Sequence, residues 1–159
     1  MSVKFQENER PFVERAENYC AASEQCASSV RAKLLVWGAS HELTDKVMKH
    51  LKEADFINEM RYAKLYCGSK LRQQKWGRVK MAYQLRAKQI PRNIIDAAIA
   101  SVDEQAYNEA LQSLLVEKWA LLASETDDRK RRVKLTNFLA SKGFELSEIQ
   151  NCIQNNIKE

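Results

Sequence analysis

Pairs of apolar residues recur along this chain at nearly equal intervals. The pairs return after 51 and then 54 residues, as Val30/Leu34, Met81/Leu85 and Leu135/Leu139. Repeats of roughly 20–50 residues are typical of stacked helical units in which neighbours cover each other's apolar faces. The recurrence therefore predicts an all-α chain of three tandem three-helix repeats, stacked into an elongated, curved array.

The composition agrees with helices and leaves little material for a β-architecture. Only four glycines and two prolines occur among 159 residues, too few turn formers for a series of hairpins. Runs of Ala, Leu, Lys, Glu, Gln and Arg favour helix, and the hydrophobic content of 45% is enough for a core. We divide the chain into a flexible N-terminal segment (1–11), repeat 1 (12–57), repeat 2 (58–102) and repeat 3 (103–159).

Start and stop signals place the ends of several helices. Ser28 or Ser29 is expected to cap the second helix, and Ser40 the third. Gly38 and Gly143 suit the left-handed conformation that follows a helix. The bounds expected for five of the helices are 12–22, 59–74, 103–124, 132–142 and 146–157.

The second repeat is strongly basic. Ten Lys and Arg residues and no Asp or Glu lie between Met60 and Ile95, whereas the whole chain has a net charge of +5. The remainder of the chain therefore sums to −5. Ordinary solvated helices mix both signs of charge, which favours solubility and Glu–Lys pairs. We interpret the stretch as a surface that faces an anionic partner.

Helical spacing sorts the basic side chains into two stripes. One stripe contains Arg61, Lys64, Gly68, Arg72 and Lys75, and the other contains Lys80, Gln84 and Lys88. The best interface candidates are Arg61, Arg72, Lys75 and Arg78. Arginine can grip a carboxylate or phosphate with two parallel hydrogen bonds, whereas the lysines Lys64, Lys80 and Lys88 would add longer-range attraction.

The aromatic residues of this repeat have a structural and a functional interpretation. Trp76, beside Gly77, either packs between the first two helices or is an exposed anchor on which bases could stack. We favour packing while keeping Trp76 among the binding candidates. Tyr62, Tyr66 and Tyr83 are assigned to the core.

A second basic run, 129–132, stands at the expected start of a helix in repeat 3. The helix macrodipole disfavours positive charge at that end, so a partner would relieve a local cost. Arg131 and Arg132 are therefore also candidates for partner binding. The neighbouring Asp127 and Asp128 could equally offset this charge.

Several segments resemble the RecX family, regulators of the RecA recombinase. Residues 56–63 (FINEMRYA) are similar to the opening of that family's second repeat, and Arg72, residues 75–79 (KWGRV), Leu85, Lys88 and Ile90 continue the pattern. Arg131-Arg132, Leu135 and residues 139–145 (LASKGFE) resemble the third repeat. The chain departs from the family at Asn58, where an acid is usual, and at Gln89, where a glycine is usual. We therefore expect the helix end at Gln89 to close differently.

The resemblance implies a helical-repeat protein that lies in the groove of the RecA–single-stranded-DNA filament. It would inhibit recombinase ATPase, strand exchange and co-protease activity, in DNA repair and the SOS response. The implied partners are the RecA filament and single-stranded or duplex DNA, and the protein is expected to be a monomer. A non-specific nucleic-acid-binding module and a scaffold for an unrelated protein are the alternatives. Charge alone does not choose between acidic protein and phosphate as the target.

Other function classes find little support in the sequence. The chain has no P-loop, nucleophile elbow or plausible triad, so we expect neither an enzyme nor a cofactor. Its four cysteines include no CxxC motif, and we interpret them as core residues of a cytoplasmic protein. His41 and His50 are not spaced as metal ligands on one helical face. The polar residues 1–11 do not resemble a signal peptide, and no apolar run approaches the ~20 residues that span a bilayer.

Overall fold

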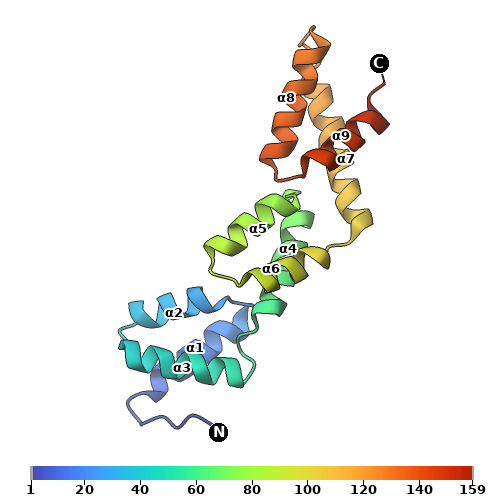
Figure 1. Cartoon of the computed structure of the whole chain (residues 1–159). Helices are drawn as coiled ribbons and strands as arrows, with labels where there is room; N and C mark the ends of the chain where they lie inside the picture. The colour runs from blue at the N-terminus through green and yellow to red at the C-terminus, as the bar shows by residue number, and fades with distance from the viewer. Residues whose placement is uncertain (1, 159) are drawn as a thin grey trace.

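The computed structural model describes residues 2–158, which form nine α-helices and no strand. The helices are α1 (Arg10–Ala22), α2 (Ala27–Val36), α3 (His41–Glu53), α4 (Glu59–Gln74), α5 (Arg78–Ala87), α6 (Arg92–Ala100), α7 (Glu104–Leu121), α8 (Asp128–Ser141) and α9 (Leu146–Asn156). They pack as three successive triplets along one long axis, with the termini at opposite ends (Figure 1). The all-α class and the array of three stacked helical repeats are therefore confirmed. Below, repeats 1, 2 and 3 denote the triplets α1–α3, α4–α6 and α7–α9.

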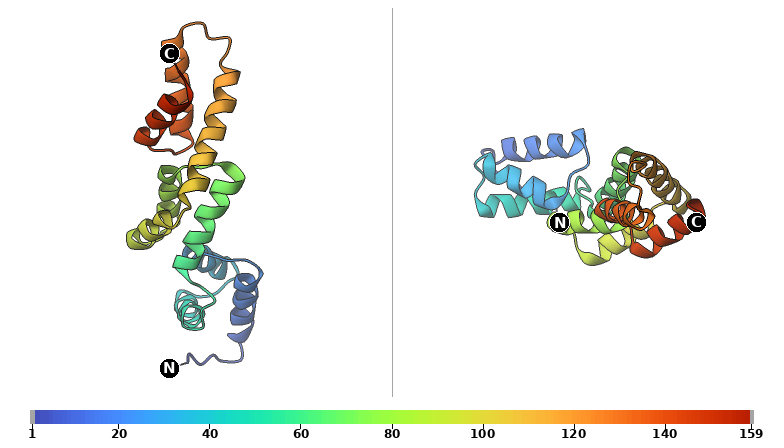
Figure 2. Two further views of the ribbon diagram at one scale, coloured as in Figure 1. Left: turned by 90° about the vertical axis from the view of Figure 1, so that its right-hand side faces the viewer. Right: turned by 90° about the horizontal axis from the view of Figure 1, so that it is seen from above.

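The recurring apolar pairs lie at the centre of each repeat. All six residues of these pairs are fully buried: Val30, Leu34, Met81, Leu85, Leu135 and Leu139. Repeat 1 has its own core, whereas a second buried cluster runs through repeats 2 and 3 without interruption. Cys26, at the start of α2, belongs to this second cluster and so connects repeat 1 to it. In the side view, α4 and α7 follow one another along the molecule (Figure 2). The repeats thus join end to end through buried contacts.

The helices α2, α5 and α8 end in the same backbone turn. The residue in the left-handed conformation is Gly38, Gln89 or Gly143, with φ of 97°, 63° and 97°. In each turn, the next amide donates to the carbonyl five residues earlier; the Ile90 N–H donates to the Leu85 oxygen at 3.1 Å. The expectation that Gln89 changes this closure is wrong, because glutamine itself adopts the left-handed conformation.

Helix starts show which side chains cap them. The Ser40 side chain accepts from the Leu43 amide at 3.1 Å, as the sequence predicts. The cap expected at Ser28 or Ser29 is wrong, because α2 already begins after Cys26. The start expected at residue 132 is also wrong: α8 begins four residues earlier, at Asp128, with Asp127 as its cap, so the basic run 129–132 belongs to the first turns of the helix.

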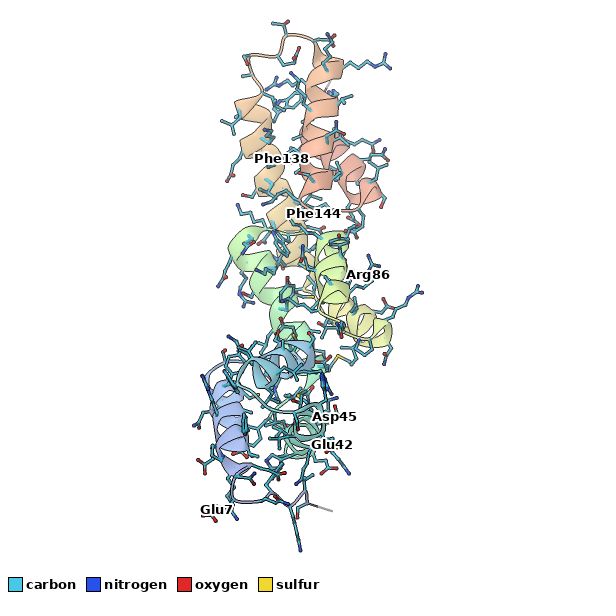
Figure 3. The ribbon with its side chains drawn as sticks, turned by 90° about the vertical axis from the view of Figure 1, so that its left-hand side faces the viewer. Glu7, Glu42, Asp45, Arg86, Phe138 and Phe144 are labelled. Carbon is cyan, nitrogen blue, oxygen red and sulfur yellow. The ribbon has the colours of Figure 1, made fainter. Side chains whose placement is uncertain are left out.

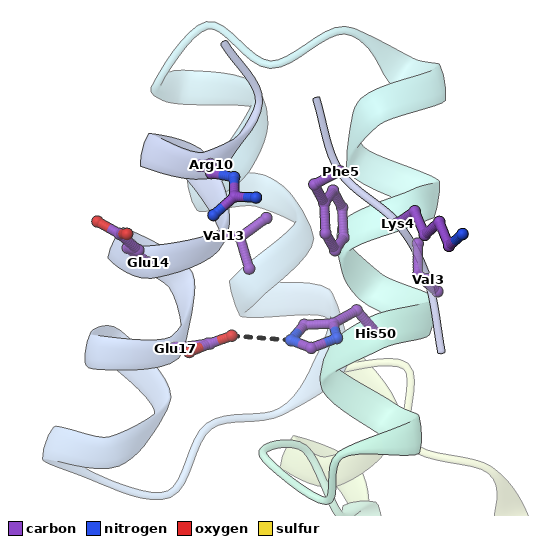
Figure 4. A pocket seen from close by; sticks show the side chains of 8 residues that line it. All are labelled: Val3, Lys4, Phe5, Arg10, Val13, Glu14, Glu17 and His50. Carbon is purple, nitrogen blue, oxygen red and sulfur yellow. Dashed lines mark hydrogen bonds and ion pairs between the residues drawn. The ribbon is translucent and has the colours of Figure 1, made fainter. Parts of the chain in front are cut away.

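The N-terminal segment lies against repeat 1, which differs from the flexible tail expected for residues 1–11. The Phe5 ring packs edge-on against His50, with 5.4 Å between the ring centroids. Glu9 pairs with Lys46 at 2.7 Å, and α1 begins at Arg10. A cavity of about 540 Å³ opens between this segment and the helices α1 and α3, where His50 hydrogen-bonds to Glu17 (Figure 4). Among residues 2–158, no helix is long and apolar enough to cross a membrane.

Candidate functional site: the basic surface of repeat 2

One exposed basic surface lies on α4, which we call the outer face of α4: Lys64, Leu65, Gly68 and Arg72. Lys64 and Arg72 are exposed, and the apolar Leu65 between them is 53% exposed. The Arg72 side chain folds back over the helix, so that a Cβ added at Gly68 would lie 3.0 Å from its Nη1 atom. The absence of a side chain at Gly68 therefore leaves room for this guanidinium. The outer face presents two cations around an apolar centre.

A second basic surface lies between α4 and α5 and combines lysines with aromatic rings. The half-buried Trp76 ring has the Lys70 and Lys80 ammonium nitrogens 4.8 and 4.7 Å from its centroid. It also packs against Tyr66, with 6.4 Å between ring centroids. The Lys88 nitrogen lies 5.8 Å from the Tyr66 centroid. Lys80 and Lys88 thus turn toward α4.

The remaining side of α5 is exposed. Tyr83 is 63% exposed and Val79 55% exposed, so the assignment of Tyr83 to the core is wrong. Arg86, on the same side of α5, points away from the body of the molecule (Figure 3). Tyr83 lies two positions from Met81 and Leu85, which carry the buried side of this helix.

Arg78 is engaged inside the molecule, where repeats 2 and 3 meet. Its guanidinium carbon lies 3.8 Å from the centroid of the Tyr107 ring, and its nitrogens pair with Glu145 at 3.0 Å and with Glu104 at 2.6 Å. Its side chain is only 16% exposed. Burial would lower the pKa of Arg78, but the hydrogen bond to Glu145 outweighs it and the pKa is raised. Arg78 is therefore a fixed cation of the joint between the repeats.

The two joints between repeats are built from the same pair of residue types. The Tyr107 hydroxyl accepts from the Arg78 amide at 3.1 Å and donates to Glu145. At the joint between repeats 1 and 2, Glu59 accepts from the Ala27 amide at 2.8 Å. Burial, followed by the neighbouring Cys26, raises the pKa of Tyr62 there. At one joint, Glu59 and Tyr62 of α4 thus contact the start of α2. At the other, Glu104 and Tyr107 of α7 contact the start of α5.

This joint motif was missed in the sequence, although a signal is present. A glutamate stands three residues before each tyrosine, as Glu59 and Tyr62 and again as Glu104 and Tyr107. The spacing places both side chains on one face at a helix start. The signal consists of two residues only. It becomes significant only when the two pairs are seen to stand at equivalent positions of repeats 2 and 3.

Two further candidates from the basic stretch also hold the repeats together. The Arg61 guanidinium pairs with Glu24 at 2.8 Å and with Asp55 at 3.0 Å, and the hydrogen bond to Glu24 raises its pKa. The Lys75 ammonium donates to the Ser113 hydroxyl at 2.8 Å. Arg61 thereby connects repeat 2 to repeat 1, and Lys75 connects it to repeat 3.

The candidates in repeat 3 are held by residues of α7 and of their own helix, α8. The Arg131 guanidinium carbon lies 3.6 Å from the centroid of the Trp119 ring, and its Nη2 donates to the Trp119 carbonyl at 2.6 Å. Arg132 pairs with Asp128 at 2.8 Å. Arg129 and Lys130 are exposed. The basic run is thus divided between packing and solvent.

The ten sequence candidates consequently fall into two groups. Those held in contacts within the chain are Arg61, Lys75, Arg78, Arg131 and Arg132. Lys64, Arg72, Lys80 and Lys88 form no ion pair within 4.0 Å in the part of the chain that the structure describes, and Trp76 lies beside Lys80. In that same part, no cluster of His, Cys, Asp and Glu could hold a metal ion, and the four cysteines are free thiols.

Known protein families and curated proteins of similar sequence agree on one family for this chain. The family description "RecX, second three-helix domain" matches residues 58–99, and "RecX, third three-helix domain" matches residues 105–153. A curated relative from Chlorobium limicola, named "Regulatory protein RecX", is 32% identical over 123 residues, which are 76% of this chain and 74% of that protein. Another of that name, from Prosthecochloris aestuarii, is 28% identical over 91% of this chain and 92% of that protein.

Some relatives are longer than this chain. The "Regulatory protein RecX" of Clostridium acetobutylicum is 30% identical over 138 residues, which cover 85% of this chain but 64% of that protein. The chain spans 56% of the Clostridium tetani relative. Among solved structures, RecX from Lactobacillus salivarius superposes with a TM-score of 0.84 at 23% identity, covering 94% of this chain and 96% of that one. This likeness shows a shared fold.

Proposed function

The chain belongs to the RecX family, and from this premise we propose that it binds the filament of a RecA-type recombinase on single-stranded DNA and inhibits it. The family relatives are named regulatory proteins. Inhibition would act on ATP hydrolysis, strand exchange and co-protease activity. The proposal includes a monomer that acts in the cytoplasm and carries no catalytic activity of its own.

The observation that carries the proposal is the outer face of α4. Lys64 and Arg72 are exposed cations without a carboxylate partner among residues 2–158, and Leu65 between them is an exposed apolar residue. Unpaired charge of one sign steers association with a surface of the opposite sign. An arginine beside an apolar side chain is also a frequent composition of the energetically important centre of an interface.

The joints between repeats support this function by fixing the face in space. Arg61 and Arg78 each bridge two repeats through pairs of ion-pair contacts. A rigid, elongated array can follow a long groove without losing conformational entropy on binding. We therefore propose that Arg61, Lys75, Arg78, Arg131 and Arg132 maintain the shape of the array, while Lys64 and Arg72 contact the filament.

The test is recombinase ATPase activity on single-stranded DNA, titrated with this protein at two salt concentrations. Wild type should inhibit at near-stoichiometric amounts, and inhibition should weaken at higher salt because the steering is electrostatic. The variant Lys64→Glu/Arg72→Glu should need at least about tenfold more protein for half-inhibition, which corresponds to about 1.4 kcal/mol.

The matched control is Lys52→Glu/Arg92→Glu, which changes the net charge equally. Lys52 is exposed on α3, and the Arg92 side chain is 94% exposed on α6. The control should inhibit like wild type. If wild type leaves the ATPase unaffected at stoichiometric protein, the proposed function is wrong. If the control loses as much inhibition as the α4 variant, net charge alone is responsible and the outer face is not the site.

A further inference from the structure

A row of aromatic rings and ammonium groups follows the seam between α4 and α5. We call it the lysine–aromatic ladder, and it comprises Tyr62, Tyr66, Lys70, Trp76, Lys80 and Lys88. The rings of Tyr62 and Tyr66 are stacked, with centroids 5.9 Å apart and an interplanar angle of 30°. The Trp76 ring continues the row at 6.4 Å from Tyr66. The ladder lies on a different side of α4 from the outer face.

Each lysine of the ladder is held over an aromatic ring. The Lys70 nitrogen lies 5.4 Å from the Tyr66 centroid and 4.8 Å from the Trp76 centroid, so it bridges two rings. Lys80 lies over Trp76 at 4.7 Å, and Lys88 over Tyr66 at 5.8 Å. Cation–π attraction orients an ammonium group without neutralising its charge. Within the described residues, none of these three nitrogens has a carboxylate within 4.0 Å.

The chemistry of the ladder favours a phosphate polymer over an acidic protein surface. All three of its cations are lysines, which bind phosphate as compact point charges. A row of cations without carboxylate partners suits the high density of negative charge along a nucleic acid backbone. Half-buried rings beside such a row are characteristic of single-strand binding, in which bases stack on aromatic side chains.

We propose that the lysine–aromatic ladder binds the phosphodiester backbone of single-stranded DNA, and that the half-buried Trp76 ring contacts a base. This assignment rests on the proposed function, which places the protein on a filament that contains single-stranded DNA. It adds that one face of repeat 2 contacts the DNA strand. The outer face of α4 remains the contact with the recombinase.

The experiment measures binding of fluorescein-labelled dT20 to the full chain by fluorescence anisotropy, without recombinase, over a range of salt concentrations. Three phosphate contacts should give a log–log salt slope of about −2, since each contributes about −0.7 on a single strand. The variant Lys70→Gln/Lys80→Gln/Lys88→Gln should bind at least tenfold more weakly and lose most of that slope. The intrinsic tryptophan fluorescence should be quenched by dT20 in wild type, but not in Trp76→Phe.

The control variant is Lys33→Gln/Lys49→Gln/Lys52→Gln, which removes three exposed lysines from repeat 1. It should bind dT20 like wild type, and all variants should retain the helical circular dichroism of wild type. Equal loss in both triple variants, or unchanged binding in the ladder variant, would overturn the inference. Competition by poly-glutamate as strong as that by dT20 would also overturn it, because the ladder would then be a site for acidic protein.

The recombinase ATPase assay separates this inference from the proposed function. If the ladder variant loses DNA binding while the outer-face variant loses ATPase inhibition, both proposals stand. If the ladder variant still binds dT20 but no longer inhibits the ATPase, the ladder contacts the recombinase. The inference about DNA is then wrong, and the proposed function stands.

Discussion

Gly77 and Gly143 meet backbone to backbone at the joint between repeats 2 and 3. A Cβ placed on Gly77 would lie 2.3 Å from the carbonyl carbon of Gly143. The Gly77 amide donates to the Lys142 carbonyl at 2.8 Å, and the Val79 amide donates to the Gly143 carbonyl at 2.9 Å. The start of α5 is thus bonded directly to the turn after α8. This approach is possible only because neither loop carries a side chain at the point of contact.

Replacing Gly77 by alanine should open this joint. The added methyl group meets backbone that cannot rotate away, so we expect a loss of about 2–3 kcal/mol, similar to overpacking a core. Urea unfolding followed by circular dichroism measures this loss. Gly68→Ala is the matched control, because its Cβ would meet only the flexible end of Arg72. Alanine inside a helix should stabilise α4 by about 0.5–1 kcal/mol. Equal stability of the two variants would contradict the close approach at Gly77.

The hydroxyl of Tyr107 should contribute substantially to the free energy of unfolding. It accepts from the Arg78 amide and donates to Glu145, and the whole residue is buried. Tyr107→Phe leaves the Arg78 amide without its acceptor, which typically costs about 1–3 kcal/mol at a buried site, while Glu145 keeps its ion pair with Arg78. The change should appear as a lower urea midpoint. Tyr83→Phe removes a hydroxyl from an exposed ring and should leave the midpoint unchanged. A shift of the same size in both variants would show that the joint does not depend on this hydroxyl.

The central features of the fold could be predicted because they depend on local sequence. Val30, Met81 and Leu135 recur with the repeat and are all fully buried, so the core follows from hydrophobic spacing alone. Ser40 caps α3 through a hydrogen bond three residues away, which a sequence also displays directly. Hydrophobic spacing thus predicts the buried side of each middle helix, and a capping residue predicts the start of α3.

The binding candidates were harder to place, because helical spacing describes one helix in isolation. Arg78 pairs with Glu145, which is 67 residues away, and Arg131 stacks on Trp119 from the neighbouring helix. Both arginines stand near helix starts, where a stacked array brings a second helix against the first. A projection of one helix therefore predicts that these two arginines are exposed, and the neighbouring helix covers them. Lys64 and Arg72 lie in the body of α4, and there the same projection is correct: both are exposed.

Gln89 offers a test of backbone strain at a helix end. Its φ of 63° lies in the left-handed region, which disfavours residues with a Cβ by about 1–2 kcal/mol. Gly38 and Gly143 occupy the equivalent turns with φ of 97°. Gln89→Gly should therefore stabilise the chain, by about 0.5–1 kcal/mol after the greater entropy of glycine in the unfolded state is included. Thermal unfolding would measure the gain, with Gln84→Gly inside α5 as the destabilising counterpart. A loss of stability in Gln89→Gly would refute the strain.

The buried thiol of Cys67 should make stability fall at alkaline pH. Burial raises its pKa from an ordinary 9.0 to about 11. Below pH 9 both the folded and the unfolded chain retain the proton, so its contribution is complete. Between pH 9 and 11 the unfolded chain loses the proton and the folded chain keeps it, so stability should decrease by about 1.4 kcal/mol per pH unit.

The variant Cys67→Ala isolates that contribution in urea unfolding at a series of pH values. Its stability should decrease less steeply between pH 9 and 11 than that of wild type, by about 1.4 kcal/mol per unit. Cys26→Ala is the contrast: burial raises the pKa of Cys26, but hydrogen bonds from Ser28 and Ser29 outweigh this and lower it. A lowered pKa gives stability that is already complete above the ordinary value of 9.0. The slope of Cys26→Ala over this window should therefore match wild type, and a wild-type slope in Cys67→Ala would mean that its thiol ionises equally in both states.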